Sequence, residues 1–194
     1  MSKIERRALA AMAPLAGKSP RGLKRLVNTY RLTRVMRGST GIADLEAGST
    51  GKTPLYPYLL FALACEVGLT TETAALVAEV AGRNLPDDGL HPLVTCLFPD
   101  DPADEGLDDT QTRLRERLDA EGMRAAVLTA VHAVYVAAAG GDPLETRVTD
   151  TGLDNPGKAP QREDKIFVDR KTGSERFAQA FPEAARFTFR PRNR

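Results

Sequence analysis

The chain has no tryptophan, and aromatic residues make up only 6% of its 194 positions. Alanine is abundant instead, which favours close packing of helices through small side chains over the core of a β-sandwich. A hydrophobic content of 42% is enough for a core of moderate size. The composition therefore predicts a mainly α-helical protein of one domain, or of one domain with an extended tail.

Cysteine and histidine are equally scarce, with two residues of each. Cys65 and Cys96 lie in apolar sequence surroundings, which is typical of small core residues in a reducing compartment, and no disulfide is required. His91 and His132 have no Cys, Asp or Glu at ligand spacing, and His132 lies beside the apolar positions of a helix. We therefore expect no metal site, no catalytic residues and no catalysis by this chain alone.

Long apolar runs and a targeting signal are also lacking. The longest apolar stretch, residues 55–65, contains Pro57 and falls short of the ~20 residues that span a bilayer. The charged N-terminus is not followed by the apolar segment of a signal peptide. These absences predict a cytoplasmic protein without a transmembrane segment. Because the net charge is only +1, local clusters of charge are more informative than the total.

Hydrophobic periodicity predicts five to seven helices in a helical domain over residues 1–140. We expect helices at residues 3–16, 19–37, 54–67, 71–81, 110–120 and 122–139, and a short segment, helical or irregular, at 90–98. The helix at 54–67 is apolar on every side and is expected to be the central buried one. Polar residues 41–53 and acidic residues 99–109 are expected to be loops.

The composition changes after residue 140, where glycine, proline and charged residues replace the helical pattern. Residues 141–194 are predicted to form an extended or partly ordered arm, with a small β-hairpin near residues 166–177. Its spaced aromatic residues suit a tail that folds onto a partner or onto the helical domain, and these are Phe177, Phe181, Phe187 and Phe189. At the basic end of the chain, the candidate contact residues are Phe187, Phe189, Arg190 and Arg192.

The most informative stretch is residues 19–32, which combine a helix start, an apolar stripe and a basic face. Ser19 is a good N-cap and Pro20 suits the first helical position. At about 100° per residue, one face gathers Leu23, Leu26, Val27 and Tyr30. The other face gathers the candidate anion- or partner-binding residues Arg21, Lys24, Arg25, Asn28 and Arg31. Gly38 is expected to end this helix.

The same stretch resembles the start of the C-terminal helical region of KAP-type P-loop NTPases, where the pattern Ser-Pro-Arg-x-x-Lys-Arg-x-x-Asn-x-Tyr-Arg-Leu is typical. Residues 58–64 are similar to the apolar helix that follows this motif, and residues 185–189 to the Arg-Phe-Ser-Phe ending. Members of the family are ATPases, several of them linked to membrane or phage-defence systems. The resemblance implies a lid-like helical module in which Arg21 acts like a sensor arginine on a nucleotide held by another domain. It also implies that Lys24 and Arg25 assist and that Asn28 bonds to nearby backbone.

The chain does not carry a complete nucleotide site of its own. Residues 48–53 resemble the end of a phosphate-binding loop, but Glu46 occupies the position where that loop needs glycine. No strand followed by an acidic Mg²⁺-binding residue is present either. We therefore expect no cofactor, except ATP supplied by a partner domain.

Three interpretations of the basic helix remain open. It could belong to a non-catalytic accessory or interaction subunit that acts through a partner chain, either a separate ATPase or another copy of itself. It could instead bind nucleic acid together with the Arg-rich tail, since residues 21–37 supply six cations. It could also be a solvated helix whose cations pair with acidic residues 100–109. We favour the first interpretation.

Overall fold

The structure is a computed structural model, and it describes residues 1–17, 19–47, 53–83, 91–98, 106–144 and 170–187. In these residues it contains eight α-helices and no strand. They are α1 (Lys3–Met12), α2 (Pro20–Ala47), α3 (Tyr56–Gly68), α4 (Thr71–Ala81), α5 (Pro92–Leu97), α6 (Asp109–Ala120), α7 (Arg124–Ala138) and α8 (Arg170–Phe187). The mainly α-helical prediction is confirmed. Seven of the described helices, α1–α7, lie within residues 1–140, in agreement with the five to seven expected there, and α8 is an additional helix in the C-terminal segment.

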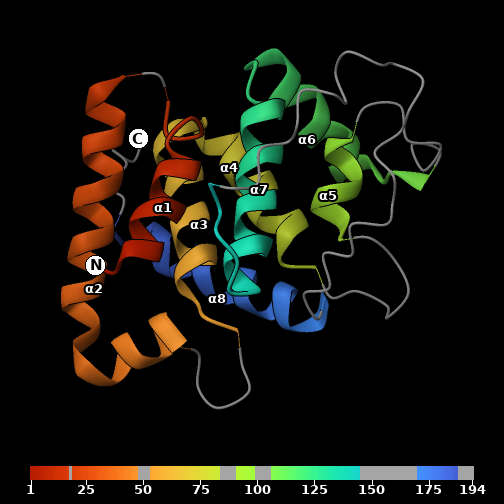
Figure 1. Ribbon diagram of the computed structural model, residues 1–194. Helices are drawn as coiled ribbons and strands as arrows, with labels where there is room; N and C mark the ends of the chain where they lie inside the picture. The colour runs from red at the N-terminus through yellow and green to blue at the C-terminus, as the bar shows by residue number, and fades with distance from the viewer. Residues whose placement is uncertain (18, 48–52, 84–90, 99–105, 145–169, 188–194) are drawn as a thin grey trace.

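Helix α3 forms the centre of the fold, as its apolar sequence predicts. Its side chains are buried from Tyr56 to Cys65. Helices α1, α2, α4, α7 and α8 all pack against it (Figure 1). Because α3 is apolar all round, it can be covered on every side without burying a polar side chain. Helices α5 and α6 pack on α4 and complete the far end of the molecule.

Several helices begin where their capping residues predict. Thr70 accepts a hydrogen bond from the backbone N–H of Thr73 at 3.3 Å and caps α4. The Asp108 side chain accepts a hydrogen bond from the backbone N–H of Gln111 at 2.9 Å, and the Gln111 side chain accepts one from the backbone N–H of Asp108 at 3.1 Å. Together these two bonds form a capping box at the start of α6. The short segment at 90–98, left open between helical and irregular, contains helix α5.

The C-terminal segment corrects the prediction of an extended arm. Residues 170–187 form helix α8, so the hairpin predicted near 166–177 is wrong where the structure describes it. Phe177 packs edge-on against Tyr58, with ring centroids 4.8 Å apart, and Phe181 packs edge-on against Phe61 at 6.1 Å. Contact of these two phenylalanines with the helical domain, one of the two expectations, is therefore confirmed. Residues 145–169 and 188–194 lie outside the described residues.

Helix α2 differs from its prediction at the C-terminal end. Gly38 adopts φ 65° and ψ −173° and kinks the helix. This positive φ favours glycine, and the predicted helix end lies at this kink. The chain then continues helically to Ala47, so the loop predicted at 41–53 is wrong for its first part. Leu45, which is fully buried, anchors this second segment in the core.

Both cysteines are buried thiols outside any disulfide, as expected for core residues. Burial raises the pKa of the Cys96 thiol to about 12, so this thiol is neutral and unreactive at ordinary pH. Among the described helices, none is long and apolar enough to cross a bilayer.

Candidate functional site

The basic helix α2 is anchored at its start. The backbone N–H of Gly22 donates to Ser19 Oγ at 3.1 Å, which confirms Ser19 as the N-terminal cap. Gly22 itself lies against the turn that follows α1, where a Cβ would come within 2.4 Å of the Ala16 carbonyl oxygen. Only glycine permits this approach without a shift of the backbone. The first turn of α2 therefore has a fixed position relative to α1.

The inner face of α2 is the apolar face that the sequence predicts. Leu26 and Tyr30 are fully buried, and Val27 packs against the core. Leu23, the fourth predicted member, lies at the edge of this face and is 37% exposed. The helix is therefore oriented on α3 as the helical periodicity indicates.

Glu5 of α1, to which the sequence analysis assigns no role, holds α2 from one side. Its fully buried carboxylate accepts hydrogen bonds from the Tyr30 hydroxyl and from Arg34 Nη1. Burial on its own raises the pKa of Glu5, but bonds from Tyr30 and the Ser2 backbone, with the charge of Arg34, lower it overall. Glu5 is therefore ionised at neutral pH. Arg34 also donates from Nη2 to Glu46 Oε1 at 2.7 Å.

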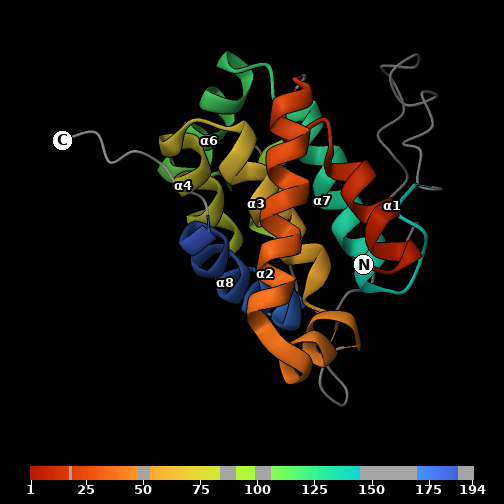
Figure 2. The same cartoon turned by 90° about the vertical axis from the view of Figure 1, so that its left-hand side faces the viewer.

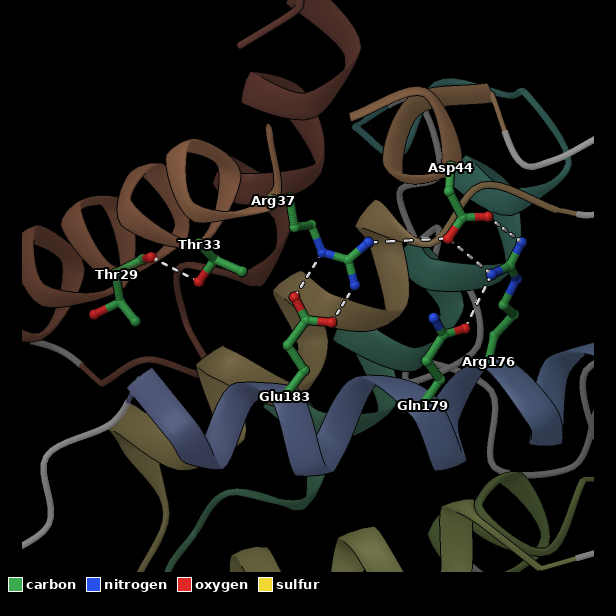
Figure 3. Close-up of polar contacts among 7 residues, drawn as sticks. All are labelled: Thr29, Thr33, Arg37, Asp44, Arg176, Gln179 and Glu183. Carbon is green, nitrogen blue, oxygen red and sulfur yellow. Dashed lines mark hydrogen bonds and ion pairs between the residues drawn. The ribbon is translucent and has the colours of Figure 1, made fainter. Parts of the chain in front are cut away.

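A second set of ion pairs holds α2 to α8 (Figure 3). Arg37 donates from Nε to Glu183 Oε1 at 2.6 Å, and its second donor, Nη2, bonds the other oxygen of the same carboxylate. Beyond the kink, Asp44 accepts from the two terminal nitrogens of Arg176 at 3.2 and 3.4 Å. Arg176 also donates to Gln179 at 3.0 Å. Two of the six cations of residues 21–37, Arg34 and Arg37, therefore serve the fold.

Helix α2 lies at the surface of the molecule (Figure 2). The other four cations are exposed and lie on the outer face of this helix, away from the core. The five predicted anion- or partner-binding residues are all exposed and share this face: Arg21, Lys24, Arg25, Asn28 and Arg31. The side chains of Arg21, Lys24 and Arg31 form no ion pair or hydrogen bond with any other described residue. We define the outer face of α2 as these five residues together with Leu32, Val35 and Met36.

Of the acidic residues 100–109 that could pair with this face, the structure describes only those from 106 onward. Asp108 pairs with Arg83 of the α4 end, not with α2. Residues 100–105 lie outside the described residues. Within the described residues, Arg34 pairs with Glu5 and Glu46, and Arg37 pairs with Asp44 and Glu183.

The outer face also carries an apolar strip that the sequence does not predict to be exposed. Leu32, Val35 and Met36 are 51%, 76% and 68% exposed. Their spacing of i, i+3 and i+4 places them together on the side of the helix that carries the exposed cations. The signal is present in the sequence, because these positions continue the row of Arg21, Arg25 and Asn28 at helical spacing.

A recess of about 450 Å³ opens beside this strip, between the start of the chain and α2. It is lined by Met1, Arg6, Arg31, Arg34 and Val35. The side chains of Arg6 and Arg31 have no ion pair among the described residues. An arginine fork matches a carboxylate or a phosphate with two parallel hydrogen bonds, so the recess suits an anionic group.

The other candidate residues have structural roles or lie outside the described part. His91 accepts from the Leu93 N–H at 3.2 Å, its Nε2 lies 3.2 Å from the Ala81 carbonyl oxygen, and burial lowers its pKa to about 4. It is therefore a neutral capping residue of α5. Of the predicted tail contacts, Phe187 ends α8, while Phe189, Arg190 and Arg192 are not described. No group of His, Cys, Asp and Glu side chains within the described residues is placed to hold a metal ion.

No protein-family model, curated protein or solved structure matches the chain. The resemblance to KAP-type P-loop NTPases therefore stays a prediction.

Proposed function

We propose that this chain is a non-catalytic helical accessory subunit that acts by binding a partner chain through the outer face of α2. One observation carries the proposal: some cations of this helix are paired with carboxylates of the fold, and others are exposed. Arg34 and Arg37 point inward and are paired with carboxylates. Arg21, Lys24 and Arg31 point outward and have no partner among the described residues. A row of like charges repels itself, and an anionic surface of a partner removes that cost.

The resemblance to KAP-type NTPases makes the proposal more specific. In this form the partner is a nucleotide-binding chain, a separate ATPase or another copy, and Arg21 approaches the terminal phosphate. A guanidinium suits this role because it is planar and permanently charged. The capped first turn supports it, since Ser19 and Gly22 hold Arg21 on a fixed and exposed turn. ATP comes from the partner, and both chains work in the cytoplasm.

A nucleic-acid backbone is the second candidate for the anion, since the same face could contact phosphates. Two features favour a protein partner instead. Two of the six cations of residues 21–37 are turned inward and paired, which shortens the basic row. Leu32, Val35 and Met36 occupy the same face, and exposed apolar strips are typical of protein interfaces.

Site-specific photocrosslinking in the cells that encode the chain tests the proposal. A photoreactive amino acid at position 24 should give one predominant protein adduct, and Arg21→Glu should remove it. The same label at Thr129, an exposed position on α7, is the matched control and should give no such adduct. Equal adducts from both positions, or none from position 24, would contradict the proposal.

The nucleic-acid alternative is tested with the purified chain and labelled single- and double-stranded DNA and RNA at low salt. We expect no saturable change in fluorescence anisotropy. Binding that weakens steeply with salt and is lost in Lys24→Glu would favour the nucleic-acid function and overturn ours.

A further inference from the structure

The apolar strip on the outer face of α2 is contiguous, not a set of scattered side chains. Leu32, Val35 and Met36 are neighbours on one helix side and are all at least half exposed. They make up half of the six large apolar side chains that are exposed in the described part of the chain. Single exposed apolar residues are ordinary, whereas a contiguous group marks a surface that is covered in the functional state.

Contacts on both sides of α2 prevent the helix from rotating about its axis, so the strip stays on the surface. Tyr30 and Arg34 are held by the buried carboxylate of Glu5 on α1. On the other side, Arg37 is held by Glu183 on α8. Rotation of α2 would break both sets of bonds and bury unpaired charges, which is costly. The strip is therefore a rigid surface, and the kink at Gly38 ends it.

The charged side chains beside the strip indicate which residue types a partner surface needs in order to bind there. Val35 lines the recess that also contains Arg6, Arg31 and Arg34. The carboxylates that face these arginines are Glu5, which is buried, and Glu46, which pairs with Arg34. Arg6 and Arg31 keep their charge without a described partner. The complementary surface therefore carries apolar side chains for the strip and carboxylates for Arg6 and Arg31.

We propose that Leu32, Val35 and Met36, together with Arg6 and Arg31, bind an acidic amphipathic helix of the partner chain. A helix offers apolar side chains at i, i+3, i+4 and i+7, which matches a strip with the same spacing. Glutamate or aspartate on one flank of that helix reaches the two arginines. This inference rests on the proposed function, since it takes α2 as the partner-facing helix, but it depends on a different part of the face from Arg21 and Lys24.

A synthetic probe tests the inference on the full chain. The probe is a fluorescein-labelled peptide with leucine at i, i+3, i+4 and i+7 and glutamate along one flank. We expect saturable binding by fluorescence anisotropy. A scrambled peptide of the same composition, and one with lysine in place of each glutamate, should both bind roughly tenfold more weakly or worse. Equal binding of either control peptide would overturn the inference.

Variants locate the binding. Val35→Asp and Arg31→Glu should each weaken binding of the probe by about tenfold. The matched controls are Leu144→Asp and Arg113→Glu, which change an exposed apolar and an exposed cationic residue elsewhere and should have no effect. If Val35→Asp reduces helicity by circular dichroism, the milder Met36→Gln replaces it, with a weakening of a few-fold expected. Unchanged binding in these variants would overturn the inference.

The outcomes separate this inference from the proposed function. Cross-linking from position 24 with no preference for the acidic probe overturns the inference alone. Specific binding of the probe without any adduct from position 24 supports the inference and overturns the proposed role of Arg21 and Lys24. Binding to phosphatidylglycerol vesicles that is lost in Val35→Asp, without peptide binding, would assign the strip to a lipid surface and overturn the inference.

Discussion

The hydroxyl of Tyr30 on α2 donates a hydrogen bond to the carboxylate of Glu5 on α1, and both residues are fully buried. The two are 25 positions apart in the chain. This bond, with the one from Arg34, decides which side of α2 faces the core and which faces outward. The outer face of α2 stays exposed because these bonds hold the opposite face of the helix against α1.

Removal of the Tyr30 hydroxyl should therefore destabilise the protein. We expect Tyr30→Phe to lower the free energy of unfolding by about 1–3 kcal/mol, because a buried ionised acceptor loses a donor. Urea unfolding followed by circular dichroism measures the change. Tyr56→Phe is the matched control, since the Tyr56 hydroxyl has no hydrogen bond with another described residue, and we expect less than about 0.5 kcal/mol for it. Equal effects of the two variants would contradict this role of Tyr30.

His91 should make stability depend on pH. Burial lowers its pKa from 6.5 to about 4, so the unfolded chain binds the proton more readily than the folded one. The stabilisation is complete above pH 6.5 and is lost as the pH falls toward 4, by about 3 kcal/mol in total. His91→Gln should flatten the stability profile between these pH values, measured as urea unfolding against pH. Parallel profiles of the variant and the native chain would show that His91 does not titrate in this way.

Helix α8 should be essential to the core. Phe177 is fully buried among Tyr58, Phe61 and His91, so we expect Phe177→Ala to cost about 3–5 kcal/mol of stability. Phe187→Ala, at the partly buried end of the same helix, should cost much less. Chemical unfolding of both variants provides the comparison. A small effect of Phe177→Ala would indicate that α8 is not packed against the core.

The ion pair between Arg37 and Glu183 should be energetically coupled. Both side chains are largely shielded, at 15% and 16% exposure, and the pair joins segments 146 positions apart. A double-mutant cycle with alanine at both positions should give a coupling of about 1–3 kcal/mol. The exposed pair of Arg117 and Glu72 is the reference, with less than about 1 kcal/mol expected. Similar coupling in the two pairs would mean that Arg37 does not hold α2 to α8.

Much of the helical framework follows from local patterns. Periodic apolar residues and caps such as Thr70 and Ser19 place most helices within a few residues of their observed bounds. Helix α8 was missed because Gly173, Pro182 and many charges obscure its stripe of Phe177 and Phe181. These residues become a helix face only once α3 lies beside them.

Part of the candidate site could also be predicted from local sequence patterns. The exposure of Arg21, Lys24 and Arg31 follows from helical periodicity, which is a local property. The strip of Leu32, Val35 and Met36 shares this helical spacing, but its exposure is not evident from the sequence, because apolar side chains are assigned to the core unless the fold shows otherwise. The role of Glu5 depends on contact with Tyr30, which no local pattern contains.

The most direct test of the central claim, that the outer face of α2 is covered by a partner, is hydroxyl-radical footprinting, which oxidises exposed methionine and leucine side chains. Met36 is 68% exposed and Met12 is fully buried. In the purified chain Met36 should oxidise rapidly and Met12 slowly, by mass spectrometry of the peptides. In the cells that encode the chain, Met36 should be strongly protected while exposed Leu144 stays as reactive as in the purified chain. Equal oxidation of Met36 in both settings would contradict the account.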